Sequence, residues 1–133
     1  MCGISGIINF DQISIKESIL KKMTDLLSYR GPDDEGIYIK DNVGLVYRRL
    51  SIIDLAGGKQ PFVSESENLV LTYNGEVYNY KEIRKELKGE NFVTDSDTEV
   101  ILKAYRKWGI SCLEKFRGMF AFAIFDKRKR MIY

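Results

Sequence analysis

The feature that most constrains the fold is an unbroken apolar run near the end of the sequence, MFAFAIF at residues 119–125. A strand with one face in water would alternate apolar and polar residues, and this run does not, so we expect a strand covered on both faces. Helical patterns lie before it in the chain. A doubly covered strand together with helices predicts sheet packed on sheet, with the helices outside. The sequence therefore indicates an α+β chain with a buried β-core.

Further stretches have the composition of strands. They are an apolar opening at residues 3–10, a hairpin of 36–40 and 43–48 around an Asp41-Asn42 turn, an extended segment at 49–55 before a loop, NLVLTY at 68–73, and a last strand beginning at 131. Asn74-Gly75 is expected to end the strand at 68–73. The last strand stops inside an apolar stretch, so we expect it to lack a neighbour. An isolated 1–133 chain would then either self-associate, for example as a homodimer, or be less stable than an extended chain.

Apolar residues at helical spacing predict helices, and each of the first three begins with a capping pattern. The pairs are Ser14 with Glu17, Asn79 with Glu82, and Ser96 with Glu99. The first pair comes before an apolar face from Ile15 to Leu27 that includes Ile19 and Leu26. Gly109 is expected to end the helix that begins at the third pair. Ser111 with Glu114 indicates one more short helix, which carries Cys112 as an expected core residue.

Composition narrows the class of protein. The 133 residues are 44% hydrophobic and 30% charged, which fits one globular domain. The net charge of +2 gives no argument for a nucleic-acid or membrane partner. Two cysteines do not make a disulfide framework, and neither a signal peptide nor a membrane-spanning run is recognisable. A cytoplasmic protein is therefore expected.

The first residues indicate a possible nucleophile. Cys2 follows Met1 directly, so removal of Met1 would leave one residue with both a thiol and a free α-amine. Such an amine titrates close to neutral pH and can take the thiol proton. The sequence has no histidine, which excludes a Cys-His dyad, a Ser-His-Asp triad and a His-ligated zinc. The alternative is a small buried cysteine at the start of a strand, with Met1 retained.

Six stretches follow one another in a specific order. They are MCGISGI at 1–7, RGPDDEG at 30–36, RRLSIIDL and GGKQPF within 48–62, YNGEVYNYKE at 73–82, DSDTEVIL at 95–102 and RGMFAFAIFD at 117–126. Together they resemble the N-terminal glutaminase domain of asparagine synthetases. Other class II glutamine amidotransferases share the terminal cysteine and the Asn-Gly pair, but their intervening motifs differ.

This resemblance implies the fold of the N-terminal-nucleophile hydrolases, an αββα four-layer sandwich. Residues 1–133 would be a type 2 glutamine amidotransferase domain that is incomplete at its C-terminal end. The implied activity is hydrolysis of L-glutamine to glutamate and ammonia through a thioester on Cys2. In the family, a second, synthetase domain uses the ammonia to amidate aspartate with ATP and Mg²⁺. That domain is absent from this sequence, and we expect no cofactor or metal in residues 1–133.

The resemblance also assigns roles to six residues. The catalytic residues would be Cys2 as nucleophile and Asn74 and Gly75 as the oxyanion hole; the substrate-binding residues would be Arg49 for the α-carboxylate and Asp97, assisted by Glu76, for the α-ammonium. An amide N–H₂ and a backbone N–H are suitable oxyanion donors, and a guanidinium binds a carboxylate through two hydrogen bonds.

Each of these assignments has a plainer alternative. Asn74-Gly75 is also a common turn pair, and Arg49 could be a solvated charge at a strand end. Glu76 could be a loop carboxylate, and Asp97 is favoured in the first turn of a helix by the helix dipole.

One residue departs from the family pattern, because Tyr47 stands where the family usually has histidine. Tyrosine can fill a similar space and donate one hydrogen bond, but it does not titrate near neutral pH. Since the α-amine would be the base, we expect the change to tune activity, with the positioning of Arg49 as the point affected.

Two other functions stay open. The domain could donate nitrogen to a sugar or a peptide instead of aspartate, and residues 1–133 do not discriminate between acceptors. It could also be a catalytically silent regulatory domain. Retention of all six residues argues against a silent domain, which would not need them.

Overall fold

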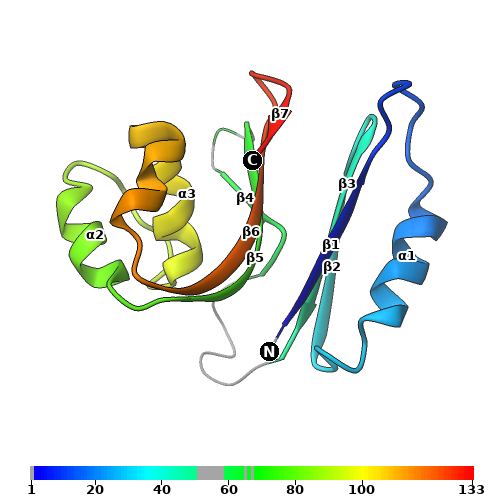
Figure 1. Cartoon of the computed structure of the whole chain (residues 1–133), viewed down its shortest axis with the longest axis horizontal. Coiled ribbons are helices and arrows are strands. Elements are labelled where there is room, and N and C mark those ends of the chain that lie inside the picture. Colours follow the sequence, from blue (N-terminus) through cyan, green and yellow to red (C-terminus); the bar gives the residue numbers. More distant parts are fainter. Residues whose placement is uncertain (1, 51–58, 65, 67) are drawn as a thin grey trace.

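The computed structural model describes residues 2–50, 59–64, 66 and 68–133. Two antiparallel sheets face each other, and helices cover their outer faces (Figure 1). Sheet A has the order β1 (Gly3–Ile8), β3 (Val43–Arg49), β2 (Asp34–Lys40). Sheet B has the order β4 (Phe62–Val63), β5 (Leu69–Val77), β6 (Gly118–Asp126), β7 (Met131–Ile132).

Helix α1 (Glu17–Leu26) covers sheet A, whereas α2 (Tyr80–Glu86), α3 (Asp97–Trp108) and the 3₁₀ helix η1 (Gly109–Lys115) lie on the far side of sheet B (Figure 1). The layers therefore follow the predicted αββα order. Met1 and the predicted extended segment and loop at 51–58 lie outside the described residues.

The central strand of sheet A, β3, sends alternate side chains toward sheet B and toward α1. The predicted hairpin is confirmed, because Lys40 pairs with Val43 around the Asp41-Asn42 turn. Side chains alternate along β3, so Leu45 packs against sheet B while Val46 packs in the cluster beneath α1. This alternation decides which of the later β3 side chains reach the space between the sheets.

The predicted cap of the first helix is wrong. Helix α1 begins at Glu17, and its N-cap is Lys16, whose side chain makes no capping bond. Ile15 is buried, and its N–H donates to the carbonyl of Asp41 at 3.1 Å. The segment that holds Ser14 is therefore fixed to the β2–β3 turn before the helix can start.

Helix α1 also buries a narrower face than predicted. Leu20 and Thr24 are fully buried, whereas Ile19 is 46% exposed and Leu26 75% exposed. A helix that packs on one sheet alone buries a single stripe of side chains, and these two residues lie outside it.

Strand β6 is covered on both faces only at its C-terminal end. Ile124 and Phe125 are buried there, whereas Met119, at the other end of the same apolar run, is 70% exposed. Figure 1 shows that β5 and β6 bend away from sheet A toward the helices at the end where β6 begins. The prediction of complete cover is therefore wrong for the first half of the strand.

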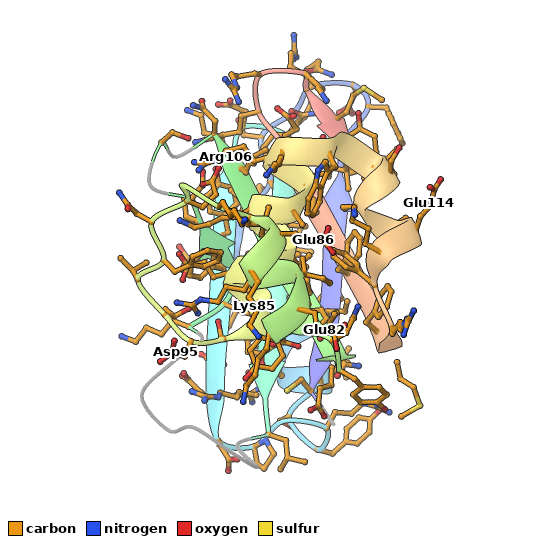
Figure 2. All side chains as sticks on the ribbon, turned by 90° about the vertical axis from the view of Figure 1, so that its left-hand side faces the viewer. Glu82, Lys85, Glu86, Asp95, Arg106 and Glu114 are labelled. Atoms are coloured by element: carbon orange, nitrogen blue, oxygen red, sulfur yellow. The ribbon has the colours of Figure 1, made fainter. Side chains whose placement is uncertain are left out.

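The largest apolar core among the described residues lies between sheet B and the helices that cover it. Cys112 is fully buried in this core, as predicted. Their outer surface is charged, with Glu82, Lys85, Glu86 and Arg106 pointing away from the sheet (Figure 2). None of the described helices is long and apolar enough to cross a bilayer.

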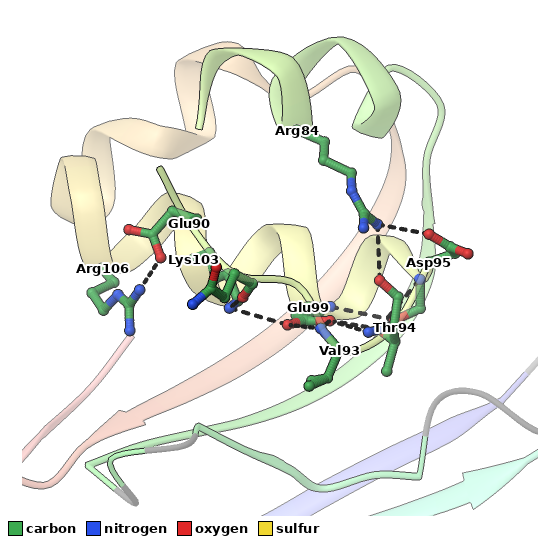
Figure 3. A network of polar contacts seen from close by, with 10 residues as sticks. Arg84, Glu90, Val93, Thr94, Asp95, Glu99, Lys103 and Arg106 are labelled. Carbon is green, nitrogen blue, oxygen red and sulfur yellow. Dashed lines mark hydrogen bonds and ion pairs between the residues drawn. The ribbon is translucent and has the colours of Figure 1, made fainter. Parts of the chain in front are cut away.

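A buried carboxylate fixes the chain just before α3 (Figure 3). Ser96 caps the helix as predicted, since its Oγ accepts from the N–H of Glu99. The Glu99 carboxylate does not return to Ser96; it accepts from the N–H groups of Val93 and Thr94 and from the Thr94 hydroxyl, and it pairs with Lys103 at 3.1 Å. Glu99 therefore fixes the loop that leads into Asp97.

Candidate active site

Cys2 lies immediately before β1 at one end of sheet A. The register of β1 and β3 pairs Gly3 with Arg48, which places Cys2 beside Arg49. Two groups donate hydrogen bonds to the Cys2 sulfur, the Tyr47 hydroxyl at 3.1 Å and the Leu50 backbone N–H at 3.4 Å. The sulfur is therefore held by two donors from the end of β3.

The two arginines at the end of β3 lie on opposite faces of sheet A. Arg48 points toward α1, where its Nε donates to the Thr24 carbonyl at 3.1 Å and its guanidinium pairs with Glu35 at 3.2 Å. Alternation places Arg49 on the other face, with Tyr47. The choice of Arg49 over Arg48 as the substrate-binding arginine is consistent with this geometry.

Asn74 and Gly75 lie inside β5, so the predicted strand end and the alternative of a turn are both wrong. The strand continues to Val77, and Gly75 pairs with Phe120 of β6. The φ of Gly75 is +146°, and a Cβ there would lie 2.2 Å from the Met119 carbonyl oxygen. Glycine is required because the strands approach too closely, at a backbone angle that other residues rarely adopt.

The side chain of Asn74 faces sheet A. Thr72, two residues earlier on the same face, donates its hydroxyl to the Val46 carbonyl of sheet A at 3.2 Å. The Asn74 amide makes no hydrogen bond to any residue that the structure describes. A preorganised donor without a partner is what an oxyanion hole requires.

Asp97 is the first residue of α3, and its carboxylate is attached to β5. One oxygen, Oδ2, accepts from the Tyr73 hydroxyl at 2.6 Å and from the Val77 N–H at 3.0 Å. Burial, followed by the bond to Asp97, raises the pKa of Tyr73, which therefore stays a donor at working pH. Glu76 follows on the exposed end of β5. These contacts orient Asp97 and leave its Oδ1 without a described partner.

The predicted residues thus form two groups on facing sheets. Cys2 and Arg49 belong to sheet A, and Asn74 to Glu76 belong to sheet B, with Asp97 bonded to the next residue of that strand. Figure 1 places the N-terminal end of the chain at the same end of the sandwich as the bend in β5 and β6. The arrangement places the Cys2 thiol on one sheet and, on the facing sheet, the Asn74 amide, which has no partner among the described residues.

Three contacts at the site were missed by the sequence reasoning. Tyr47 contacts the Cys2 sulfur, Tyr73 holds Asp97, and the Gln60 side-chain oxygen accepts from the Tyr73 N–H at 2.6 Å. Tyr47 was expected to affect the positioning of Arg49, with which it shares a face of the strand, and its contact with the Cys2 sulfur was not foreseen. The other two join elements whose relative placement the sequence does not give.

The αββα layers, with a thiol at the start of the first strand, define the architecture of an N-terminal-nucleophile hydrolase. The chain belongs to the glutamine amidotransferase domain family, whose sequence profile matches residues 1–133. The fold is also similar to that of glutamine phosphoribosylpyrophosphate amidotransferase from Bacillus subtilis, with a TM-score of 0.74 over 93% of this chain and 35% of that one. At 21% sequence identity, that likeness concerns the fold alone.

Curated relatives are more similar in sequence. The chain is 47% identical over 136 residues to glutamine-hydrolysing asparagine synthetase 2 of Bacillus subtilis, a match that covers all of this chain and 18% of that protein. It is 41% identical to asparagine synthetase B of Escherichia coli, covering 97% of this chain and 24% of that protein. The predicted family is confirmed, and the chain spans less than a third of the length of these relatives.

Proposed function

We propose that the chain hydrolyses L-glutamine to glutamate and ammonia as the glutaminase part of a glutamine-hydrolysing asparagine synthetase. The observation that carries this proposal is the placement of Cys2, held by two donors beside Arg49, opposite the sheet that presents the Asn74 amide. The names of the relatives support the overall reaction. The cytoplasm is the proposed compartment, in keeping with two unpaired cysteines.

Glutamine would be held at its two ends. Its α-carboxylate would accept two hydrogen bonds from the Arg49 guanidinium, a geometry that lysine cannot provide. Its α-ammonium would donate to the remaining oxygen of Asp97 and to Glu76. The side-chain amide would then extend toward Cys2, between the two sheets.

The chemistry follows from these positions. The Cys2 thiolate attacks the carboxamide carbon, and the oxygen of the tetrahedral intermediate gains a negative charge that the Asn74 amide and the Gly75 N–H stabilise. The C–N bond breaks as the α-ammonium of Cys2 gives a proton to the leaving ammonia. Water then attacks the thioester and releases glutamate and the thiol. This route requires removal of Met1, which intact mass of the purified protein measures.

The ammonia would serve the ATP-dependent amidation of aspartate in a synthetase domain. The described residues contain no group of three or more His, Cys, Asp or Glu side chains that could hold a metal ion. The steps with ATP and Mg²⁺ are proposed for the synthetase domain, and none is assigned to residues 1–133. The synthetase domain is the proposed partner of residues 1–133.

Labelling with 6-diazo-5-oxo-norleucine, an alkylating analogue of glutamine, tests the nucleophile. We expect an adduct on Cys2 and none on Cys112, because Cys112 is fully buried and its burial raises the pKa of the thiol to about 11. Cys2→Ala should abolish both adduct and glutaminase activity with little loss of stability. An adduct on Cys112, or no adduct on processed and folded protein, would contradict the assignment and favour a silent domain.

A product assay tests the division of labour. With glutamine, aspartate, ATP and Mg²⁺, the 133-residue chain should release glutamate and ammonia but form no asparagine. The native gene product should form asparagine under the same conditions. If it instead transfers nitrogen only to a sugar or peptide acceptor, the glutaminase proposal stands and the acceptor is wrong.

A further inference from the structure

Tyr47 is the one described side chain that donates a hydrogen bond to the Cys2 sulfur. We propose that the Tyr47 hydroxyl is a catalytic hydrogen-bond donor that stabilises Cys2 as a thiolate and fixes the direction in which the sulfur faces glutamine. This proposal rests on the proposed function, because it gives a role to a residue of the same site. It differs from the expectation that Tyr47 acts by positioning Arg49.

The geometry around the sulfur favours a defined contact. Tyr47 is 5% exposed, so its ring has one packed position, and its hydroxyl lies 3.1 Å from the Cys2 sulfur. The Leu50 N–H approaches the same sulfur at 3.4 Å. The Tyr47 side chain lies on the face of sheet A that points toward sheet B, so its hydroxyl reaches the sulfur from the space between the two sheets, whereas the Leu50 N–H comes from the backbone directly after β3.

Tyr47 keeps its proton at working pH. Burial, followed by the hydrogen bond to Cys2, raises the pKa of the phenol. Two charged groups also face it, Arg49 on the same strand, which lowers the pKa, and Asp34 on β2, which raises it. The hydroxyl is therefore a permanent donor and not a base, so the α-amine remains the group that moves protons.

A donor of this kind acts on one state of the sulfur more than on the others. A thiolate carries a full negative charge and gains most from the bond, whereas the thioester sulfur is neutral and gains little. The phenol stabilises the thiolate before attack and again when water regenerates it. No atom is transferred to or from Tyr47 in either step.

The test replaces the phenol by a ring of the same size and measures alkylation of Cys2 by iodoacetamide. In this reaction the thiolate bonds to the reagent carbon and iodide leaves, so the rate reports the thiolate without requiring the glutamine site or a free α-amine. In Tyr47→Phe at pH 7 we expect a rate constant about 3- to 10-fold lower, because a lost bond to a charged group is partly offset by the greater reactivity of a less stabilised thiolate.

The pH profile distinguishes this role from a structural one. Losing a donor should move the half-maximal pH of Cys2 alkylation upward in Tyr47→Phe, and the variant should equal or exceed the unchanged chain at high pH. Tyr105→Phe is the matched control, because Tyr105 of α3 is also buried and its hydroxyl donates to Asp126 at the end of β6 at 3.2 Å. This control should keep the profile of the unchanged chain.

Two outcomes would overturn the proposal. One is an unchanged profile in Tyr47→Phe at unchanged melting temperature. The other is an equal shift in Tyr105→Phe, which would report a general loosening of the fold. Neither outcome touches the proposed function, which fails separately if the glutamine analogue does not label Cys2. Peptide mapping assigns each adduct, so that alkylation at Cys112 is not counted.

Discussion

At the scale of one residue, the Asn74 amide carries the clearest kinetic prediction. It has no partner among the described residues and faces sheet A, which is the arrangement that the proposed oxyanion role requires. Asn74→Ala should lower kcat by about 10²–10³ and change KM little, since one lost oxyanion donor typically costs about 2.7–4 kcal/mol. Asn74→Asp, which keeps the shape and loses the donor, should lose at least as much. Steady-state kinetics that showed KM rising as much as kcat falls would refute the oxyanion role.

Arg49 should behave in the opposite way. Replacing it by lysine leaves the charge but removes the two-pronged bond to a carboxylate, so KM for glutamine should rise about 10-fold or more while kcat changes less. Arg48→Lys is the matched control, because Arg48 points to α1 and bonds to Thr24 and Glu35. It should lower the melting temperature without raising KM. A higher KM in the control alone would mean that the two arginines have been confused.

Single residues were predictable where a local rule acts. Strand alternation separates Arg48 from Arg49, and the burial of Cys112 follows from the usual burial of a free cysteine. The contact between Tyr73 and Asp97 was not predictable, since it joins β5 to the start of α3 across 24 positions of sequence. Such contacts depend on how elements pack, which no local pattern records.

At the scale of an element, the β5–β6 pair depends on Gly75. A Cβ at Gly75 would lie 2.2 Å from the Met119 oxygen and 2.5 Å from the Phe120 Cα, both in backbone that cannot move freely. Gly75→Ala should therefore lower the free energy of unfolding by about 2–4 kcal/mol and abolish glutaminase activity.

Gly89→Ala is the control for this change. Gly89 also has a positive φ of +85°, but a Cβ there meets nothing within 4 Å. Gly89→Ala should lower the free energy of unfolding by about 1 kcal/mol and keep the glutaminase activity. Chemical denaturation gives the free energy of unfolding of both variants. Equal decreases in the two would mean that the close approach of the strands does not explain why residue 75 is glycine.

The loop before α3 should respond to acid through Glu99. Burial, the largest influence, opposes its ionisation, but bonds from Thr94, Val93 and Lys103 together lower its pKa below the ordinary 4.5. The folded state therefore binds the proton less readily than the unfolded state. The resulting stability is fully present above pH 4.5 and is lost as pH falls through the lower folded pKa.

Glu99→Gln should remove this part of the pH dependence. At pH 7 it should reduce the free energy of unfolding by about 1–3 kcal/mol, because hydrogen bonds to a charged group are replaced by weaker ones. Glu90→Gln, which breaks the outer pair with Arg106, should change stability by less than about 1 kcal/mol. Denaturation curves from pH 7 to 3 compare the two, and equal slopes in Glu99→Gln and the unchanged chain would refute the assignment.

Elements were predicted better than their first residues. Apolar spacing located the helices, but the capping patterns failed at Ser14, Asn79 and Ser111. The 3₁₀ helix η1 begins at Gly109, and its N-cap Trp108 makes no side-chain capping bond. The Asn79 side chain donates to the Lys115 carbonyl and accepts from the Arg117 N–H, so it joins α2 to the chain before β6 instead of capping its own helix. A capping pattern describes what a side chain can do locally, and tertiary bonds decide what it does.

At the scale of the molecule, the Thr72 hydroxyl ties one sheet to the other through the Val46 carbonyl. Thr72→Val should reduce the free energy of unfolding by about 1 kcal/mol. It should also raise KM for glutamine, because the hydrogen bond that helps to fix the two sheets relative to each other is lost. Thr24→Val removes a buried bond from hydroxyl to carbonyl that lies within α1. It should cost a similar free energy and leave KM unchanged. Similar KM values in both variants would show that the sheets keep their spacing without Thr72.

The layered architecture itself was predictable, because a doubly apolar strand requires cover on both faces and helices were the available cover. The spacing of the sheets and the bend of sheet B were not, and these place Met119 in solvent while Ile124 is buried. Self-association through the last strand stays a prediction. Strand β7 pairs with β6 and forms an edge of sheet B.

The alternation of β3 has a consequence for changes in chain length. Neighbouring residues of this strand serve different layers, with Arg48 held by Thr24 beneath α1 and Tyr47 at the Cys2 sulfur. One residue inserted before Tyr47 would exchange the two faces, bringing Arg48 beside Cys2 and turning the phenol toward α1. One residue inserted at the Asp41-Asn42 turn could be absorbed by a longer turn. Whether an insertion in this hairpin disrupts the site therefore depends on whether it reverses the faces of the β3 residues that follow it. The distance of the insertion from Cys2 does not decide the outcome.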